Sequence, residues 1–125
     1  MAQGMDVIKQ AWEDRDGPAV LTTVAPDGKP NSVYVGEIQL QPGTGFIVAD
    51  NYFDKTRRNI ASGSQGSILF ITGAGKSYQV KGAIEYHRDG PVFDLMRATH
   101  DPKHPGVAAT VVQVQEAYSG SEKLL

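Results

Sequence analysis

The sequence predicts a mainly β protein, a closed or nearly closed barrel of six mostly antiparallel strands with two or three short helices. Short apolar runs rich in β-branched residues recur along the chain, which is typical of strands. Gly (14) and Pro (7) fall between these runs, where turns would join them. Six strands in a small domain favour closure, because an open sheet leaves unpaired edges. An open sheet with two helices packed on one face is the alternative.

Length and charge limit the classes of protein. A chain of 125 residues predicts a single domain, 1–125. Its 12 basic and 14 acidic residues give a net charge of −2, which argues against nonspecific nucleic-acid binding. The absence of cysteine excludes disulfides, iron–sulfur clusters and thiolate zinc sites, and it fits a cytoplasmic protein. No apolar run is long enough to predict a membrane span.

The first segment predicts an amphipathic helix from about Gln3 to Asp14. Charged and polar residues occupy one of its faces. Trp12 is interpreted as a core or interface residue rather than as a stacking platform. The apolar face, at spacings of three and four residues, comprises Met5, Ile8, Ala11 and Trp12.

Six later segments predict strands, each bounded by turn residues. Asp27-Gly28 predicts a hairpin turn between the first two strands. Gly36 interrupts the second strand and indicates a bulge or the close approach of another group. No element is predicted for the polar tail from Glu116. The six ranges are Ala19–Val24, Asn31–Leu40, Phe46–Ala49, Ser67–Thr72, Tyr78–Tyr86 and Val107–Val114.

A basic segment after the third strand predicts a short helix with an anion site at its start. The helix runs from Asp54, a favourable N-cap, to Ala61. Helix starts favour acidic side chains, yet the residues here are Lys55, Thr56, Arg57 and Arg58. Cations and a hydroxyl beside free backbone N–H groups predict a bound phosphate. A solvated basic surface is the alternative.

The remaining motifs are incomplete. Asp89-Gly90-Pro91 opens a further predicted helix. Gly73–Ser77 ends like a P-loop, but the position that needs the first glycine is Phe70, so a hairpin turn is predicted instead. His100 and His104 are separated by Pro102, and a surface loop is the better interpretation than a metal site. No metal site is therefore predicted.

Four segments in a fixed order carry a family resemblance. The turn Asp27–Pro30 leads into Asn31–Gly36, and Ile47–Asp50, Lys55–Ile60 and Tyr78–Gly82 follow. The pattern Lys-Thr-x-x-Asn-Ile after a strand is moderately specific, and the order of all four is more so. Together they resemble the small FMN-binding split-barrel proteins related to pyridoxamine 5′-phosphate oxidase. The resemblance implies a six-stranded antiparallel split β-barrel and a homodimer with FMN at the subunit interface.

The resemblance also implies the residues that hold FMN. Lys55 and Thr56 would bind its phosphate, with Arg57 as a third group. The second strand would line the ring and ribityl chain, in part through backbone groups, and the end of the third strand would close the ring's other edge. Gln79 would come from the partner subunit. The implied set is Val33, Tyr34, Val35, Gly36, Ala49, Asp50, Asn51, Lys55, Thr56, Arg57 and Gln79.

These residues favour electron transfer or flavin-dependent oxidoreduction, because none of them is an evident acid or base. The sequence singles out no catalytic residue and no redox partner. The chain lacks the C-terminal segment that grips pyridoxamine phosphate in the full oxidases, which argues against pyridoxamine oxidation. The alternative function is a barrel without flavin that binds another phosphorylated or hydrophobic ligand.

Overall fold

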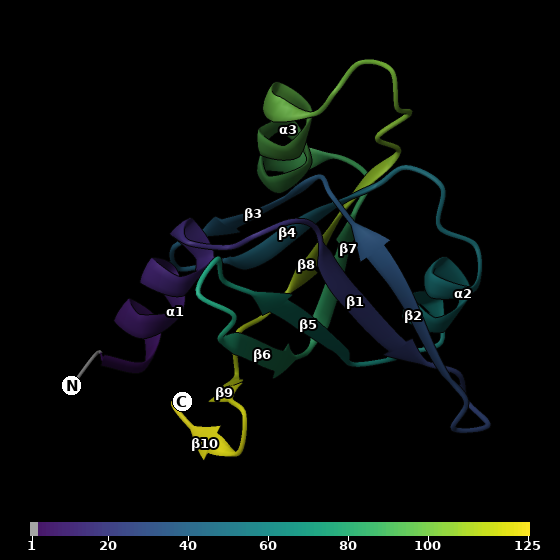
Figure 1. The fold of residues 1–125 in the computed structure, drawn as a ribbon. Helices are drawn as coiled ribbons and strands as arrows, with labels where there is room; N and C mark the ends of the chain where they lie inside the picture. Colours follow the sequence, from purple (N-terminus) through teal and green to yellow (C-terminus); the bar gives the residue numbers. More distant parts are fainter. Residues whose placement is uncertain (1–2) are drawn as a thin grey trace.

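The computed structural model describes residues 3–125, which form two antiparallel sheets and three helices (Figure 1). One sheet has the order β10-β9-β6-β5-β1-β2 and the other β3-β4-β8-β7. No helix within residues 3–125 is long and apolar enough to cross a membrane. The strands are β1 (Ala19–Val24), β2 (Pro30–Val35), β3 (Ile38–Gln41), β4 (Gly45–Asp50), β5 (Gly66–Ile71), β6 (Ser77–Gly82), β7 (Ile84–His87), β8 (Ala108–Val112), β9 (Glu116–Ser119) and β10 (Glu122–Lys123); the helices are α1 (Gln3–Glu13), α2 (Lys55–Ala61) and α3 (Gly90–Thr99).

Two predicted strands are each divided between the sheets, so the prediction of continuous strands is wrong at both places. Asn31–Leu40 becomes β2 and β3, which separate at Gly36-Glu37. Tyr78–Tyr86 becomes β6 and β7, which separate at Ala83. A Cβ on Gly82, just before the second break, would collide with the backbone carbonyl of Gln113. The chain passes from one sheet to the other at these corners and so closes the barrel.

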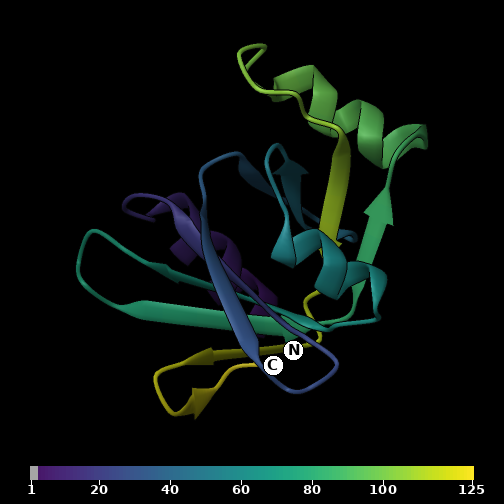
Figure 2. The same cartoon turned by 90° about the vertical axis from the view of Figure 1, so that its right-hand side faces the viewer.

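The polar tail forms two strands that the sequence analysis does not predict. β9 pairs with β6, and β10 pairs with β9, as a hairpin at the lower edge of Figure 2. Ala117 is fully buried, and its carbonyl accepts the backbone N–H of Leu124. The tail has too few apolar residues to show a period of two, so backbone pairing decides its structure.

The core lies between the two sheets, and α1 closes one end of it. The predicted apolar face of α1 is confirmed, since Ile8, Ala11 and Trp12 are buried. The Trp12 ring meets Phe46 and Phe70 edge-on, with centroids 4.9 and 5.0 Å apart. Trp12 is therefore a core residue, and its aromatic contacts fix α1 against both sheets.

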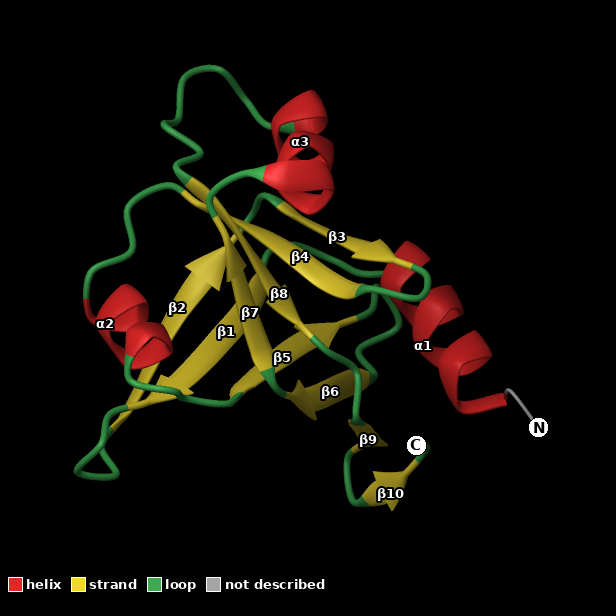
Figure 3. Ribbon diagram, turned by 180° about the vertical axis from the view of Figure 1, so that it is seen from behind, coloured by secondary structure: helices red, strands yellow, loops and turns green. Residues whose placement is uncertain are grey.

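The other two helices lie on different sides of the barrel. α3 covers the outer face of the four-stranded sheet, where Met96 packs on a separate small core with Ile47 and Val111 (Figure 3). α2 lies against β1 and β2, far from α1. After β4 the chain therefore leaves one end of the barrel, runs beside the edge strand β2 and enters α2.

Candidate functional site

One cavity gathers most of the residues that the sequence predicts for cofactor binding. It has a volume of about 420 Å³ and lies between β2, the β2–β3 corner, the end of β4 and the start of α2. Eight predicted residues line it: Val33, Tyr34, Val35, Gly36, Ala49, Asn51, Lys55 and Thr56. Six further residues complete the lining: Asn31, Glu37, Tyr52, Phe53, Asp54 and His104.

The wall formed by β2 offers backbone groups to the cavity. Among the strands of residues 3–125, β2 pairs with β1 alone and so forms an edge of the six-stranded sheet. An edge strand presents a row of unpaired N–H and C=O groups. A Cβ added to Gly36, just beyond this edge, would meet no atom of the described chain within 4 Å. The packing of the protein itself does not require glycine there, and Gly36 borders the cavity.

The end of the cavity near α2 combines a cation with a buried hydroxyl. The side chain of Thr56 is only 1% exposed, and its hydroxyl oxygen accepts a 3.1 Å hydrogen bond from Asn31 Nδ2. This bond uses the oxygen as an acceptor and leaves the hydroxyl proton for another group. Lys55 is exposed and makes no ion pair within residues 3–125. Because α2 has only seven residues, the anion site that the sequence predicts here depends on these side chains rather than on a helix dipole.

The N-cap predicted for this helix is wrong in its chemistry. Asp54 occupies the N-cap position, but its side chain makes no capping bond within residues 3–125. Its carboxylate instead accepts a 3.1 Å hydrogen bond from Arg58 Nη2, one turn further along α2. The pair satisfies the charge of Asp54 on the surface and leaves the first backbone N–H groups of α2 without a side-chain acceptor.

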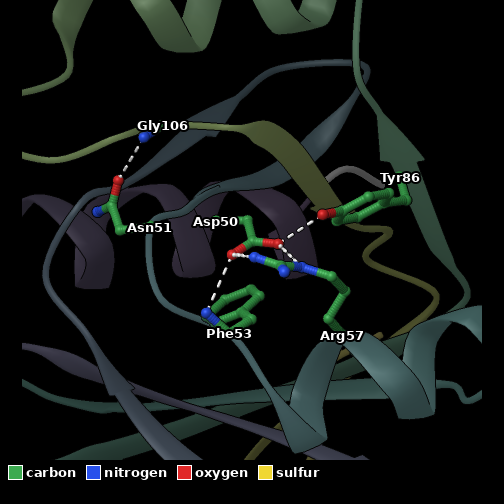
Figure 4. Close-up of polar contacts among 6 residues, drawn as sticks. All are labelled: Asp50, Asn51, Phe53, Arg57, Tyr86 and Gly106. Carbon is green, nitrogen blue, oxygen red and sulfur yellow. Dashed lines mark hydrogen bonds and ion pairs between the residues drawn. The ribbon is translucent and has the colours of Figure 1, made fainter.

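Two of the predicted residues, Asp50 and Arg57, bind each other behind the cavity lining (Figure 4). Asp50 is fully buried, and its carboxylate accepts hydrogen bonds from Arg57 Nε (2.8 Å) and Nη2 (3.0 Å). It also accepts the hydroxyl of Tyr86 (2.5 Å) and the backbone N–H of Phe53 (3.1 Å). The Asp50 carboxylate raises the pKa of Arg57. Burial, and then the bond to Asp50, raise the pKa of Tyr86.

The opposite end of the cavity is held by the loop between α3 and β8. Glu37 accepts hydrogen bonds from Asn51 Nδ2 (2.7 Å) and from the backbone N–H of Asp101 (2.6 Å). Asn51 in turn accepts the backbone N–H of Gly106 at 2.9 Å (Figure 4). The β2–β3 corner, the end of β4 and this loop are thereby tied together around the cavity.

Sequence reasoning missed the acidic and basic side chains at this end. Glu37, Tyr52 and His104 all line the cavity, and the hydroxyl of Tyr52 lies 3.2 Å from His104 Nδ1. The cavity as a whole therefore contains acidic and basic side chains beside the predicted set. His104 lies 52 residues beyond Tyr52 in a loop, and only the fold brings the two rings together. Glu37 follows the Gly36 break directly, which was the one signal available.

Gln79 lies apart from the cavity of its own chain. The strand registers place it in one row across the six-stranded sheet with Leu69, Val20 and Tyr34. Three strand spacings separate Gln79 from Tyr34, which is about 14 Å at roughly 4.8 Å per strand. The row lies on the outer face of the sheet, where Tyr34 is 79% exposed and Leu69 is 43% exposed.

Comparisons with known proteins give a family and a fold. The family model described as pyridoxamine 5′-phosphate oxidase matches residues 6–119. A protein of Methanocaldococcus jannaschii, itself described as uncharacterized, is 26% identical over 104 residues, which cover 79% of this chain and 70% of that protein. Among solved structures, HupZ of Group A Streptococcus has a TM-score of 0.77 and 20% identity over 91% of each chain.

Two further structures share the fold. An FMN-binding protein from Syntrophomonas wolfei has a TM-score of 0.74 and 16% identity, over 94% of this chain and 91% of its own. An F420 reductase has a TM-score of 0.63 and 18% identity, over 84% of this chain and 91% of its own. The split-barrel fold that the sequence predicts is confirmed by these likenesses.

Proposed function

The chain belongs to the pyridoxamine 5′-phosphate oxidase family, and on that premise we propose that it is an FMN-binding flavoprotein acting in electron transfer or flavin-dependent oxidoreduction. The observation that carries the proposal is a cavity of about 420 Å³ with Lys55 and the buried Thr56 hydroxyl at one end. This volume falls within the range of roughly 300–1,000 Å³ typical of ligand pockets.

The residues of the cavity fit the parts of FMN. The phosphate would bind Lys55 and the free hydroxyl proton of Thr56, which Asn31 holds in place. The backbone edge of β2 and the space beside Gly36 would receive the ribityl chain and the ring. Ala49 and Asn51 would close the other side. Bound FMN supplies the redox chemistry, while these residues bind and orient it and limit its contact with water.

Arg57 is not needed as a direct phosphate ligand in this arrangement. Its guanidinium already makes two hydrogen bonds to Asp50. It anchors the first turn of α2 to the end of β4, and so it positions Lys55 and Thr56 from behind. Asp50 also has a positioning role, because its bonds fix the end of β4, where its two neighbours in sequence, Ala49 and Asn51, line the cavity.

The proposed assembly is a homodimer that uses the outer face of the six-stranded sheet. This face carries an apolar group formed by Tyr34, Leu69 and Ile71, which are between 43% and 79% exposed. Tyr34 and Leu69 lie in one row of the sheet with Val20 between them. Exposed apolar patches of this kind mark interaction sites. A second copy would bury them and would bring its own Gln79 toward the cavity, which Gln79 cannot reach within one chain. The proposed compartment is the cytoplasm, which the absence of cysteine supports.

The first experiment is the visible absorbance spectrum of the purified protein, before and after addition of FMN and desalting. We expect flavin bands that survive desalting. A protein that stays colourless would contradict the proposal and favour a barrel that binds another phosphorylated or hydrophobic ligand. A titration with F420 belongs to the same experiment, because one structural neighbour is an F420 reductase. If the protein binds F420 but not FMN, the proposed cofactor is wrong and the proposed binding site still stands.

The phosphate position is tested by comparing FMN with riboflavin, which lacks the phosphate. Lys55→Gln and Thr56→Val should each weaken FMN binding about tenfold, the loss of one charge-assisted hydrogen bond, and leave riboflavin binding unchanged. Lys9→Gln, on the exposed face of α1, is the matched control for lost charge. Equal losses for FMN and riboflavin would mean that the phosphate does not lie at this corner.

The dimer is tested by light scattering. Leu69→Glu with Ile71→Glu places two charges on the apolar group and should convert the dimer into a monomer. A wild-type monomer at micromolar concentration would contradict the proposed assembly while leaving the cavity residues as assigned.

A further inference from the structure

A second groove continues from the phosphate end of the cavity. It has a volume of about 430 Å³ and lies between the β1–β2 turn and α2. It shares Asn31 and Lys55 with the flavin cavity, so the two spaces meet at the proposed phosphate position. The other residues of its lining are Ala25, Asp27, Lys29, Pro30, Arg58 and Asn59.

The lining of this groove is predominantly cationic. Lys29, Lys55 and Arg58 face a single carboxylate, Asp27. One oxygen of Asp27 already accepts the backbone N–H of Lys29 at 3.0 Å. Within residues 3–125, neither lysine makes an ion pair. A negatively charged group entering the groove would therefore meet two lysines that no acid within residues 3–125 neutralises.

Arg58 is available to such a group. Its ion pair with Asp54 joins side chains that are 70% and 75% exposed, at 3.1 Å. Ion pairs this exposed contribute little to stability, and many contribute nothing measurable. A ligand anion can replace Asp54 at little cost, whereas the neighbouring Arg57 is held by a buried carboxylate and cannot be redirected so easily.

The groove also has a formed floor. Asn59 is only 6% exposed, and its Nδ2 donates a 3.0 Å hydrogen bond to the buried hydroxyl of Thr23. Asn31 at the shared wall is fixed by its bond to Thr56. These bonds hold α2 at a set distance from β1 and β2, so the groove exists before any ligand binds.

FMN would leave the groove unused, because FMN ends at the phosphate beside Lys55 and Thr56. Resting on the proposed flavin site, we propose that the groove binds a second anionic group attached beyond that first phosphate. The site would then accept flavin nucleotides that are extended past the phosphate as well as FMN itself. The extended cofactors share one chemical feature, a second negatively charged group attached beyond the phosphate that follows the ribityl chain. It can come from a second phosphate, as in FAD, or from carboxylates, as in the tail of F420.

The experiment measures dissociation constants for FMN, FAD and F420 by competition on the full-length protein. FAD or F420 should bind the wild type at least as tightly as FMN does. Lys29→Gln with Arg58→Gln should weaken the extended cofactor about tenfold and change FMN affinity by less than twofold. Lys9→Gln with Lys123→Gln removes two exposed charges elsewhere and should change neither.

The outcomes separate this proposal from the one on which it rests. Two outcomes would contradict the proposed role of the groove and leave the flavin site as proposed. In the first, the protein binds FMN tightly but binds neither FAD nor F420. In the second, the groove variant loses equal affinity for FMN and for the extended cofactors. Failure of every flavin to bind would overturn both. A loss confined to FAD identifies a second phosphate as the occupant, and a loss confined to F420 identifies carboxylates.

Discussion

Arg57 and Arg58 are consecutive residues of the same seven-residue helix, yet they do different work. Arg57 makes two hydrogen bonds, at 2.8 and 3.0 Å, to the fully buried carboxylate of Asp50. Arg58 makes one, at 3.1 Å, to a carboxylate that is 75% exposed. Successive side chains on a helix point about 100° apart, so the first faces the barrel and the second faces the groove.

The difference indicates that position decides the role of a basic residue near the proposed anion site. Arg57 supports that site from behind, because it fixes the start of α2 to the end of β4. Arg58 stays free to contact a ligand, because nothing buried depends on it. A basic run in a sequence therefore does not consist of equivalent phosphate ligands. The predictions below test how far the two arginines differ.

The largest expected effect comes from Arg57→Ala. It leaves the Asp50 carboxylate buried with only Tyr86 and the Phe53 N–H as partners. Removing one partner of a buried ion pair destabilises strongly, and we expect a loss of about 3 kcal/mol in the free energy of unfolding because Arg57 is itself partly exposed. Urea unfolding measures it.

A second variant separates charge from packing. Asp50→Asn in the Arg57→Ala background removes the unpaired charge and should recover part of the lost stability. If Arg57→Ala costs less than about 0.5 kcal/mol, comparable to an exposed pair, the contrast between the two arginines is wrong. The FMN affinity of folded Arg57→Ala protein is a further measurement. If it falls as much as in Lys55→Gln, Arg57 contacts the phosphate directly.

Tyr86→Phe should have an intermediate effect. It removes a hydroxyl that donates to the same carboxylate, a charged hydrogen bond that contributes about 2 kcal/mol. The effect should also depend on pH, because burial and Asp50 raise the pKa of Tyr86 above its usual value of 10.0. The folded state then holds this proton to higher pH than the unfolded state does. The stabilisation is complete below pH 10 and declines as the pH rises through the folded pKa.

The measurement is urea unfolding between pH 7 and pH 11. The wild type should lose stability above pH 10 more steeply than Tyr86→Phe does. Tyr34→Phe, which removes an exposed hydroxyl, is the control and should follow the wild type. Identical slopes for all three proteins would mean that Tyr86 titrates alike in the folded and unfolded states.

Much of the fold could be predicted because its signals are local. The apolar spacing of α1, the Asp27-Gly28 turn and the β-branched runs each report on a few neighbouring residues, and the structure agrees with them. The corner at Ala83 could not be predicted as a sheet crossing, because side-chain alternation runs through it without a shift. At Gly36-Glu37 the apolar alternation shifts by one residue, which predicts a bulge but not a change of sheet. The pairing of β9 with β6 depends on backbone groups more than 30 residues apart, which no local pattern records.

The site residues also differ in whether a local sequence signal could predict them. Eight predicted residues come together because three short segments meet at the cavity: one from β2, one at the end of β4 and one at the start of α2. His104, Glu37 and Tyr52 were missed because their proximity depends on the loop that Asn51 and Glu37 hold. The sequence also gives no means of separating Arg57 from Arg58, since burial of Asp50 is a property of the closed barrel.

The smallest expected effect on stability comes from Arg58→Ala. Asp54 and Arg58 are four residues apart on one helix with the acid first, a favourable order, but both are exposed. Such a pair contributes about 0.3–0.5 kcal/mol, and less at high salt. Urea unfolding at low and at high salt should therefore place this variant within that margin of the wild type. A loss above 1 kcal/mol would mean that Arg58 supports the fold as Arg57 does. With stability unchanged, any loss of affinity for an extended cofactor in this variant can be assigned to the groove itself rather than to a loosened helix.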